Sequence, residues 1–208
     1  MPPAYFPSIG YMALLTAAES VMIETHDTYP KHTCRNRCTI LSAQGPLNIS
    51  IPVSKPYGSR SKTSDILIFE THIWPKKHWR AIESAYNKSP YFFHYAERIK
   101  GVVFSSKEDL LHHNMYCLDV MLDIIGAKAD VQLTSKYIKD NENVVDARNF
   151  EKFMAGVGDH YFDRYIQVFA DRHPFHNNLS IIDLICNAGP QSSVYIEKAA
   201  GVIRDKLF

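Results

Sequence analysis

Several features that would restrict the class of protein are missing from this chain of 208 residues. Its four cysteines, at positions 34, 38, 117 and 186, include no CxxC pair, so a secreted disulfide scaffold is not expected at this length. Lysine and arginine number 23 against 22 aspartates and glutamates, so no global field favours a nucleic acid or an anionic membrane. The longest apolar runs fall far short of the roughly 20 residues that span a bilayer.

These absences favour an ordinary cytoplasmic protein with reduced thiols. The N-terminus has no basic segment followed by an apolar run of the kind found in signal peptides. With 46% hydrophobic residues, the chain suits one globular domain over residues 1–208, strand-rich over 1–70 and mainly helical over 71–208. We expect no nucleic-acid partner, no membrane insertion and no metal, because Cys34 and Cys38 lack a second pair at zinc-site spacing. The sequence identifies neither a cofactor nor an oligomeric state.

Hydrophobic periodicity predicts an α/β fold, in which a mixed or largely parallel sheet is covered by helices and the C-terminal half is more helical. Strands are expected at 21–23, 39–42, 47–53 and 66–69, with the second and third forming a hairpin and an exposed loop at 54–64. Ser105 and Glu108 match a capping box for a helix that ends at Gly126. Further helices are expected at 9–18, 74–87, 180–188 and 192–206.

The segment TYPKHTCRNRC, residues 28–38, is the strongest indication of a ligand site. Two guanidinium groups, Arg35 and Arg37, flank Asn36 and could hold a phosphate or carboxylate through paired hydrogen bonds. Lys31 adds a further positive charge, and Tyr29 belongs to the same motif. A solvated basic loop in front of a strand is the alternative interpretation.

The segment HWRAIES, residues 78–84, places polar groups beside a helical apolar stripe. His78 could act as a general base for a hydroxyl or amine nucleophile, with Arg80 and Glu83 binding the substrate. The alternative is a core histidine with its ring nitrogen satisfied, next to a surface pair of Arg80 and Glu83.

A second polar group lies in NNLSIIDLICNAGP, residues 177–190. Asp183 and Asn187 are four residues apart, so they share a helix face and could recognise hydroxyls or an amine, with Asp183 taking part in catalysis. Alternatively, Ser180 and Asp183 simply stabilise the start of a helix. Cys186 fits better in the core.

Read together, several motifs resemble the WbqC-like protein family: YFPSIGYMALL, THDTYPKHTCRNRCTI, LNISIPV, KKHWRAIESAYNKSPYF and NNLSIIDLICNAGP. They occur in the family's order over nearly the whole chain. The resemblance implies a role near the synthesis of O-antigen and other bacterial surface polysaccharides, without giving a reaction. YFPSIGYMALL is also distantly similar to the HxGH loop of nucleotidylyltransferases, with Ser8 and Tyr11 at the histidine positions and a helix N-terminus that could receive phosphates.

We therefore expect a transferase that acts on an activated anionic donor, such as a nucleotide-sugar or an acyl donor. Lys31, Arg35 and Arg37 would hold the anion and His78 would serve as base. The alternative is a non-catalytic sugar- or nucleotide-binding accessory protein of a biosynthetic complex. If the three motifs serve one site, folding must bring their functional atoms within roughly 15 Å of a common centre in one pocket.

Overall fold

The computed structural model describes residues 1–69, 71–105, 107–137, 139, 144–157 and 162–207. The helices are α1 (Ile9–Ala17), α2 (Trp74–Tyr86), α3 (Phe92–Val103), α4 (Leu110–Ile125), α5 (Phe150–Val157), α6 (Ile181–Ala188) and α7 (Gln191–Leu207). The strands are β1 (Val21–Ile23), β2 (Arg37–Ser42), β3 (Gly45–Ser50), β4 (Val53–Ser54), β5 (Leu67–Ile68) and β6 (Val131–Leu133), and short 3₁₀ turns occupy Gly58–Arg60 and Thr63–Asp65. Within these described ranges, no helix combines the length and apolar character needed to cross a bilayer.

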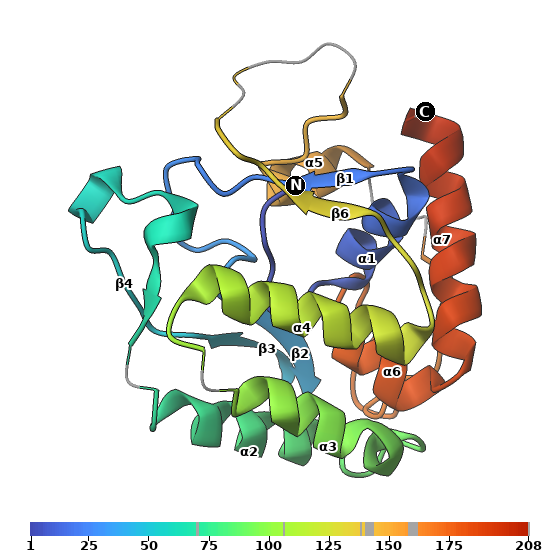
Figure 1. The fold of residues 1–208 in the computed structure, drawn as a ribbon. Helices are drawn as coiled ribbons and strands as arrows, with labels where there is room; N and C mark the ends of the chain where they lie inside the picture. Colours follow the sequence, from blue (N-terminus) through green and yellow to red (C-terminus); the bar gives the residue numbers. More distant parts are fainter. Residues whose placement is uncertain (70, 106, 138, 140–143, 158–161, 208) are drawn as a thin grey trace.

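The predicted α/β class and the more helical C-terminal half are confirmed (Figure 1). The strands form three separate pairs: β1 with β6 in parallel, and β2 with β3 and β4 with β5 antiparallel. The expected hairpin is the β2–β3 pair, in which Arg37 faces Ser50 and Ser42 faces Gly45. Pro52 follows β3 and has no backbone N–H to donate to a ladder, which helps to separate the hairpin from β4.

The helix that contains residues 110–125 starts later than predicted. Asp109, not Ser105, is its N-cap and accepts a hydrogen bond from the backbone N–H of His112. Ser105 instead bonds the imidazole of His113 at 2.9 Å, so the capping-box prediction is wrong. The predicted C-terminal stop is confirmed, because Gly126 adopts the left-handed conformation with φ of 67°.

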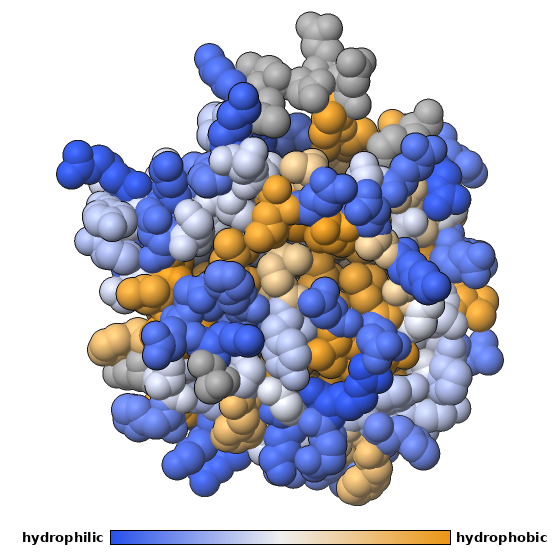
Figure 2. All heavy atoms as spheres, viewed as in Figure 1, coloured by the Kyte–Doolittle hydropathy of each residue, from blue (hydrophilic) through white to orange (hydrophobic). Residues whose placement is uncertain are grey.

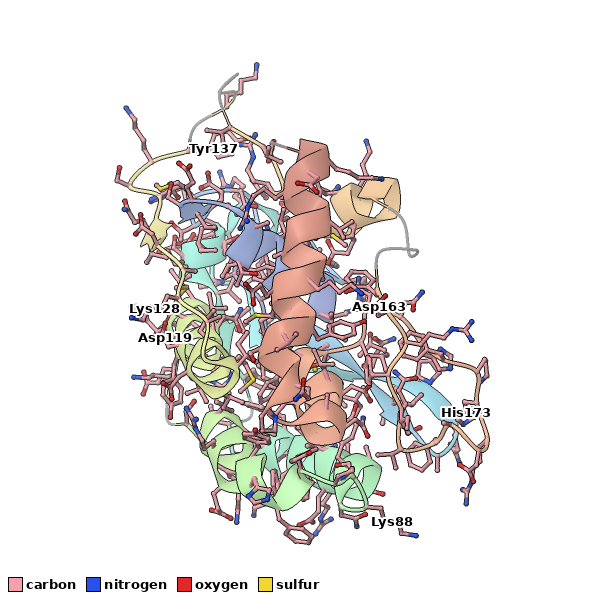
Figure 3. All side chains as sticks on the ribbon, turned by 90° about the vertical axis from the view of Figure 1, so that its right-hand side faces the viewer. Lys88, Asp119, Lys128, Tyr137, Asp163 and His173 are labelled. Carbon is pink, nitrogen blue, oxygen red and sulfur yellow. The ribbon has the colours of Figure 1, made fainter. Side chains whose placement is uncertain are left out.

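One hydrophobic core joins the two ends of the chain. Helix α1 packs along α7, and buried side chains from Ala4 to Ile203 form a single cluster (Figure 1). On the other side of the molecule, α2 and α3 lie beneath α4. The segment 162–176 runs from Asp163, which pairs with Lys198 of α7, to His173, which contacts the carbonyl of Ala43 in the β2–β3 turn (Figure 3).

The β1–β6 pair leaves apolar side chains at the surface. Met22 and Leu133 are 41% and 43% exposed, and apolar atoms gather over the middle of this face (Figure 2). The pairing joins residues more than 100 positions apart, with Val21 opposite Val131.

Candidate functional site

A cavity of about 500 Å³ lies beside the start of α1, a volume suited to a small ligand. We call it the α1 cavity. Its polar lining consists of Ser8, His32, Cys34, Arg37, Thr39, Glu151, Asn178 and Ser180, and its apolar lining includes Tyr5, Phe6, Phe150 and Met154. Thus parts of the YFPS, KHTCRNRC and NNLS motifs, which are far apart in the chain, meet at one place.

Backbone hydrogen bonds hold these three motifs together. Tyr5 N–H donates to the carbonyl of Cys34 at 2.9 Å, and Ser180 N–H donates to the carbonyl of Thr39 at 2.8 Å. The Ser180 hydroxyl donates to the carbonyl of Phe6 at 3.0 Å. The walls of the cavity are therefore fixed by the core rather than by surface side chains.

Unusual backbone conformations mark the same cavity. Among the described residues, Phe6, His32 and Asn178 are the non-glycine residues with positive φ, at 38°, 63° and 52°. All three line the α1 cavity. Such conformations cost about 1–3 kcal/mol each and concentrate at functional sites, so their shared location singles out this cavity.

The first turn of α1 offers few free donors to a phosphate. The N–H of Ile9 donates to the carbonyl of Leu179, that of Gly10 to Asn178 Oδ1, and that of Tyr11 to Ser8 Oγ. These amides are the groups that a nucleotide phosphate would need at a helix N-terminus. The nucleotidylyltransferase-like use of this helix is therefore not supported by its hydrogen bonding.

Arg37 is the predicted anion-binding residue that lines the α1 cavity. One of its terminal nitrogens contacts His32 Nδ1, and its Nε is buried without a hydrogen-bond partner. Because a guanidinium can only donate, Nδ1 is the acceptor in this contact, and Nε2 carries the ring's N–H donor. The pair therefore presents N–H donors, which suits an anion.

Arg35 lies elsewhere and has a protein partner. Its side chain is 1% exposed and forms a 2.5 Å ion pair with Asp27, whose other oxygen accepts a hydrogen bond from Thr63. Arg35 and Asp27 line a separate cavity of about 350 Å³, the Arg35 cavity, together with Thr33, Tyr137, Asp146, Arg148 and Glu151. The two arginines consequently do not form one fork around a single anion.

Glu151 lines both cavities, beside Cys34. Its Oε1 accepts the backbone N–H of Cys34 at 2.6 Å. Burial first, and then the nearby Glu151 carboxylate, raise the pKa of the Cys34 thiol well above its usual value. Cys34 is therefore protonated at neutral pH and is a poor nucleophile.

All four cysteines are free. Among the described residues, no group of three histidine, cysteine, aspartate or glutamate side chains is placed to hold a metal ion.

The remaining predicted residues of the basic motif have other surroundings. The Asn36 side chain donates to the carbonyl of Ile51 at 2.9 Å and braces the end of β3. Tyr29 is buried beneath the Lys55 ammonium, which lies 4.8 Å from its ring centre. Lys31 is exposed. Burial, and then the positive charge of Lys31, lower the pKa of Lys55.

His78 lies in the core. It is 5% exposed; Tyr5 Oη lies 2.9 Å from its Nδ1, and its Nε2 lies 3.2 Å from the carbonyl of Ser50. The carbonyl can only accept, so Nε2 carries the proton and Nδ1 accepts from Tyr5. Burial lowers the pKa of His78 to about 4. This arrangement corresponds to the core-histidine alternative. Arg80 and Glu83 are exposed on the solvent side of α2.

Asp183 is also enclosed by protein. Its Oδ2 accepts hydrogen bonds from Tyr165 Oη at 2.5 Å and from Gln167 Nε2 at 3.0 Å, and burial raises its pKa. These contacts attach the segment 162–176 to α6. Asn187 donates to the carbonyl of Asp183 at 2.8 Å, within the helix. Neither His78 nor Asp183 lines the cavities that contain Arg35 and Arg37, so the predicted groups do not share one pocket.

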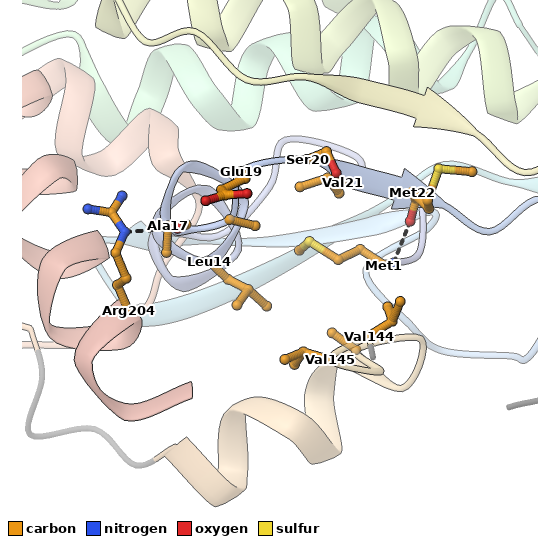
Figure 4. Close-up of a pocket in the computed structure, with 12 residues that line it drawn as sticks. Met1, Leu14, Ala17, Glu19, Ser20, Val21, Met22, Val144, Val145 and Arg204 are labelled. Atoms are coloured by element: carbon orange, nitrogen blue, oxygen red, sulfur yellow. Dashed lines mark hydrogen bonds between the residues drawn. The ribbon is translucent and has the colours of Figure 1, made fainter. Parts of the chain in front are cut away.

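A further cavity of about 500 Å³ lies between β1, the end of α1 and α7 (Figure 4). Its lining is mostly aliphatic and includes Leu14, Val21, Val144 and Val145. Arg204 enters from α7, where its guanidinium donates to the carbonyl of Ala17 at 3.0 Å and caps α1. Its polar side chains are Glu19, Ser20 and Arg204, fewer than those that line the α1 cavity.

The sequence prediction omitted His32, Glu151 and Asn178 from the site. His32 and Asn178 lie inside motifs that were recognised, so those motifs were the available signal. Glu151 has no comparable signal, because it lies outside all of the recognised motifs.

Comparisons with known proteins agree with the motifs assembled here. The model of the WbqC-like protein family matches residues 2–163. The chain belongs to the WbqC-like protein family. A relative, the uncharacterized protein Rv1507c of Mycobacterium tuberculosis, is 24% identical over 217 residues, covering 92% of this chain and 94% of that protein. No solved structure shows a significant match. In this family member, the matched region contains α1, the basic motif and Glu151, whereas Asn178 lies beyond it.

Proposed function

We propose that this WbqC-like protein binds an anionic, sugar-derived small molecule in the α1 cavity and acts as an accessory protein in the synthesis of a bacterial surface polysaccharide. The observation that carries the proposal is the Arg37–His32 pair on the wall of a cavity of ligand size. The polysaccharide context comes from resemblance to the family.

The donors of the cavity suit a phosphate or carboxylate. Arg37 donates from Nη2 to His32, so its other terminal nitrogen, Nη1, remains as a charged donor for the anion. His32 adds its Nε2–H. Asn178, which also lines the cavity, uses its carbonyl oxygen for Gly10, so its NH₂ group remains as a donor for a sugar hydroxyl.

A binding screen tests this proposal. Thermal unfolding and calorimetry would compare glucose 6-phosphate, UDP-glucose, inorganic phosphate and uncharged glucose. We expect the sugar phosphates to stabilise the protein and glucose to have no effect. In Arg37→Lys, the affinity should fall at least tenfold, because an ammonium cannot reproduce the guanidinium fork.

Arg60→Lys is the matched control, because Arg60 is exposed on a 3₁₀ turn and lines neither cavity. It should bind like the wild type. Equal affinities in both variants would remove Arg37 from the binding site, and the absence of any sugar-phosphate binding would refute the proposal.

A transferase is the second candidate, and Glu151 is the observation that favours it. One oxygen of this exposed carboxylate is held by the N–H of Cys34. The carboxylate could take the proton from the hydroxyl group of the substrate that receives the sugar. The role assigned to His78 would then belong to Glu151. Release of UDP from UDP-glucose, faster than in a protein-free control and lost in Glu151→Gln, would support transfer. Binding without UDP release would leave the accessory role.

A further inference from the structure

Glu151 occupies the boundary between two cavities. It is the second residue of α5, and it lines both the α1 cavity and the Arg35 cavity. Its place in the first turn of the helix is favourable for a negative charge. The hydrogen bond from Cys34 N–H fixes one carboxylate oxygen, so the group is held in position before any ligand arrives.

In the Arg35 cavity, the other charges are already matched. In the Arg35 cavity, Arg35 pairs with Asp27 at 2.5 Å and Arg148 pairs with Asp146 at 2.6 Å. Within the described part of the chain, Glu151 forms no ion pair with a lysine or arginine. The carboxylate therefore remains as the uncompensated negative charge where the two cavities meet.

The α1 cavity thus presents two charges of opposite sign to one ligand. Arg37 supplies the cation, and Glu151 supplies the anion. A ligand with a negative group alone would place that charge in the same cavity as the Glu151 carboxylate, and the two like charges would repel each other. A ligand with an ammonium group as well would satisfy both side chains.

We propose that the preferred ligand of the α1 cavity is an amino-sugar phosphate or its nucleotide derivative, with a free primary amine. The phosphate lies on Arg37 and His32, and the protonated amine lies on Glu151. This inference rests on the proposed function and specifies its substrate class.

The affinities of the protein for three sugar phosphates distinguish this inference from the proposed function. Glucosamine 6-phosphate carries the amine, glucose 6-phosphate replaces it with a hydroxyl, and N-acetylglucosamine 6-phosphate keeps the nitrogen without its charge. Calorimetry with the full chain at neutral pH should give at least tenfold tighter binding for glucosamine 6-phosphate than for the other two.

Glu151→Gln should abolish this preference while binding of glucose 6-phosphate persists, because the amide keeps an acceptor oxygen but loses the charge. Glu197→Gln, an exposed position on α7, is the control and should retain the preference. Equal wild-type affinities for the three ligands, or a preference that survives in Glu151→Gln, would overturn the inference and leave the proposed function intact. The comparison with the N-acetyl ligand needs no variant, so it decides the question even if Glu151→Gln does not fold. Absence of all sugar-phosphate binding would overturn both.

Discussion

Arg35 and Arg37 illustrate how two neighbouring residues of the same type take different roles. Arg35 precedes β2 and is enclosed with Asp27, whereas Arg37 begins β2 and contacts His32 at the α1 cavity. The carbonyl of Arg35 also accepts a hydrogen bond from Asn114 of α4 at 2.7 Å. Arg35 therefore links the basic motif to the core, whereas the side chain of Arg37 remains available to bind a ligand.

Removal of the Arg35 guanidinium should lower the stability of the fold. In Arg35→Met, Asp27 keeps its hydrogen bond from Thr63 but loses its countercharge. Loss of one partner from a buried ion pair costs about 3–5 kcal/mol, and we expect about 3 kcal/mol because Asp27 is partly exposed. Urea unfolding measures the change. Arg60→Met is the control, with an expected change near zero, and a loss below about 1 kcal/mol in Arg35→Met would contradict this role.

The basic motif could be recognised from the sequence, but the direction of each side chain could not. Asp27, which pairs with Arg35, lies before the motif, and Thr63, which donates a hydrogen bond to Asp27, lies well after it. Similarly, the spacing around His78 allowed both a base and a core residue. The contacts with Tyr5 and Ser50 that distinguish them come from distant segments.

At the level of secondary-structure elements, local signals in the sequence predicted most of the helices and the β2–β3 hairpin. Helices α3 and α5 were missed. In α3, a buried stripe at helical spacing is formed by Phe92, Ala96, Ile99 and Val103. Pro90 indicated the end of α2. The N-cap of α3 is Tyr91, which makes no side-chain cap hydrogen bond, so no capping residue in the sequence indicates that a second helix starts there. The error at α4 arose because two polar residues, Ser105 and Asp109, compete as caps, and only Asp109 is placed to bond the first turn.

Close packing at the start of α1 predicts a strong effect of one methyl group. A Cβ at Gly10 would lie 2.6 Å from Met154 Cε and 2.8 Å from Asn178 Oδ1. Gly10→Ala should therefore destabilise the protein by about 1–3 kcal/mol and disturb the α1 cavity. Gly201→Ala on α7 is the control, because a Cβ there meets nothing within 4 Å and alanine favours a helix by up to about 1 kcal/mol. Thermal unfolding should shift in opposite directions, and a stabilised Gly10→Ala would contradict the packing.

At the level of the whole molecule, the sequence predicted the α/β class but not how the strands pair. Strands β1 and β6 have three residues each, and about 110 positions separate the partners Val21 and Val131. Runs this short are ambiguous in periodicity, and nothing in them specifies a distant partner. The meeting of residues 5–8, 34–39 and 178–180 at the α1 cavity has the same origin in long-range packing.

Two buried imidazoles should make the stability of the whole fold depend on pH. Burial lowers the pKa of both His78 and His113 to about 4, and Tyr5 and Trp74 pack against both rings. Between the unfolded pKa of about 6.5 and this value, the unfolded chain binds more protons than the folded one. The free energy of unfolding should therefore be fully retained above about pH 6.5 and fall as the pH decreases toward 4.

Urea titrations at several pH values would measure this decrease in the free energy of unfolding. His78→Gln removes one of the two titrating groups, so its profile should be flatter whatever its absolute stability. His94→Gln, at an exposed position on α3, should keep the steep profile of the wild type. A profile for His78→Gln as steep as that of the wild type would show that His78 does not contribute.

The packing of α1 against α7 also has a consequence for synthesis on the ribosome. The apolar surface of α1, with Ile9, Met12 and Leu15 buried in the finished fold, finds its main partner only when residues 191–207 emerge. At roughly 5–20 residues per second, α1 waits about 10–40 s without that cover. The nascent N-terminal segment should accordingly bind chaperones until residues 191–207 emerge, and the α1 cavity cannot acquire its Asn178–Ser180 wall before that segment has been synthesised.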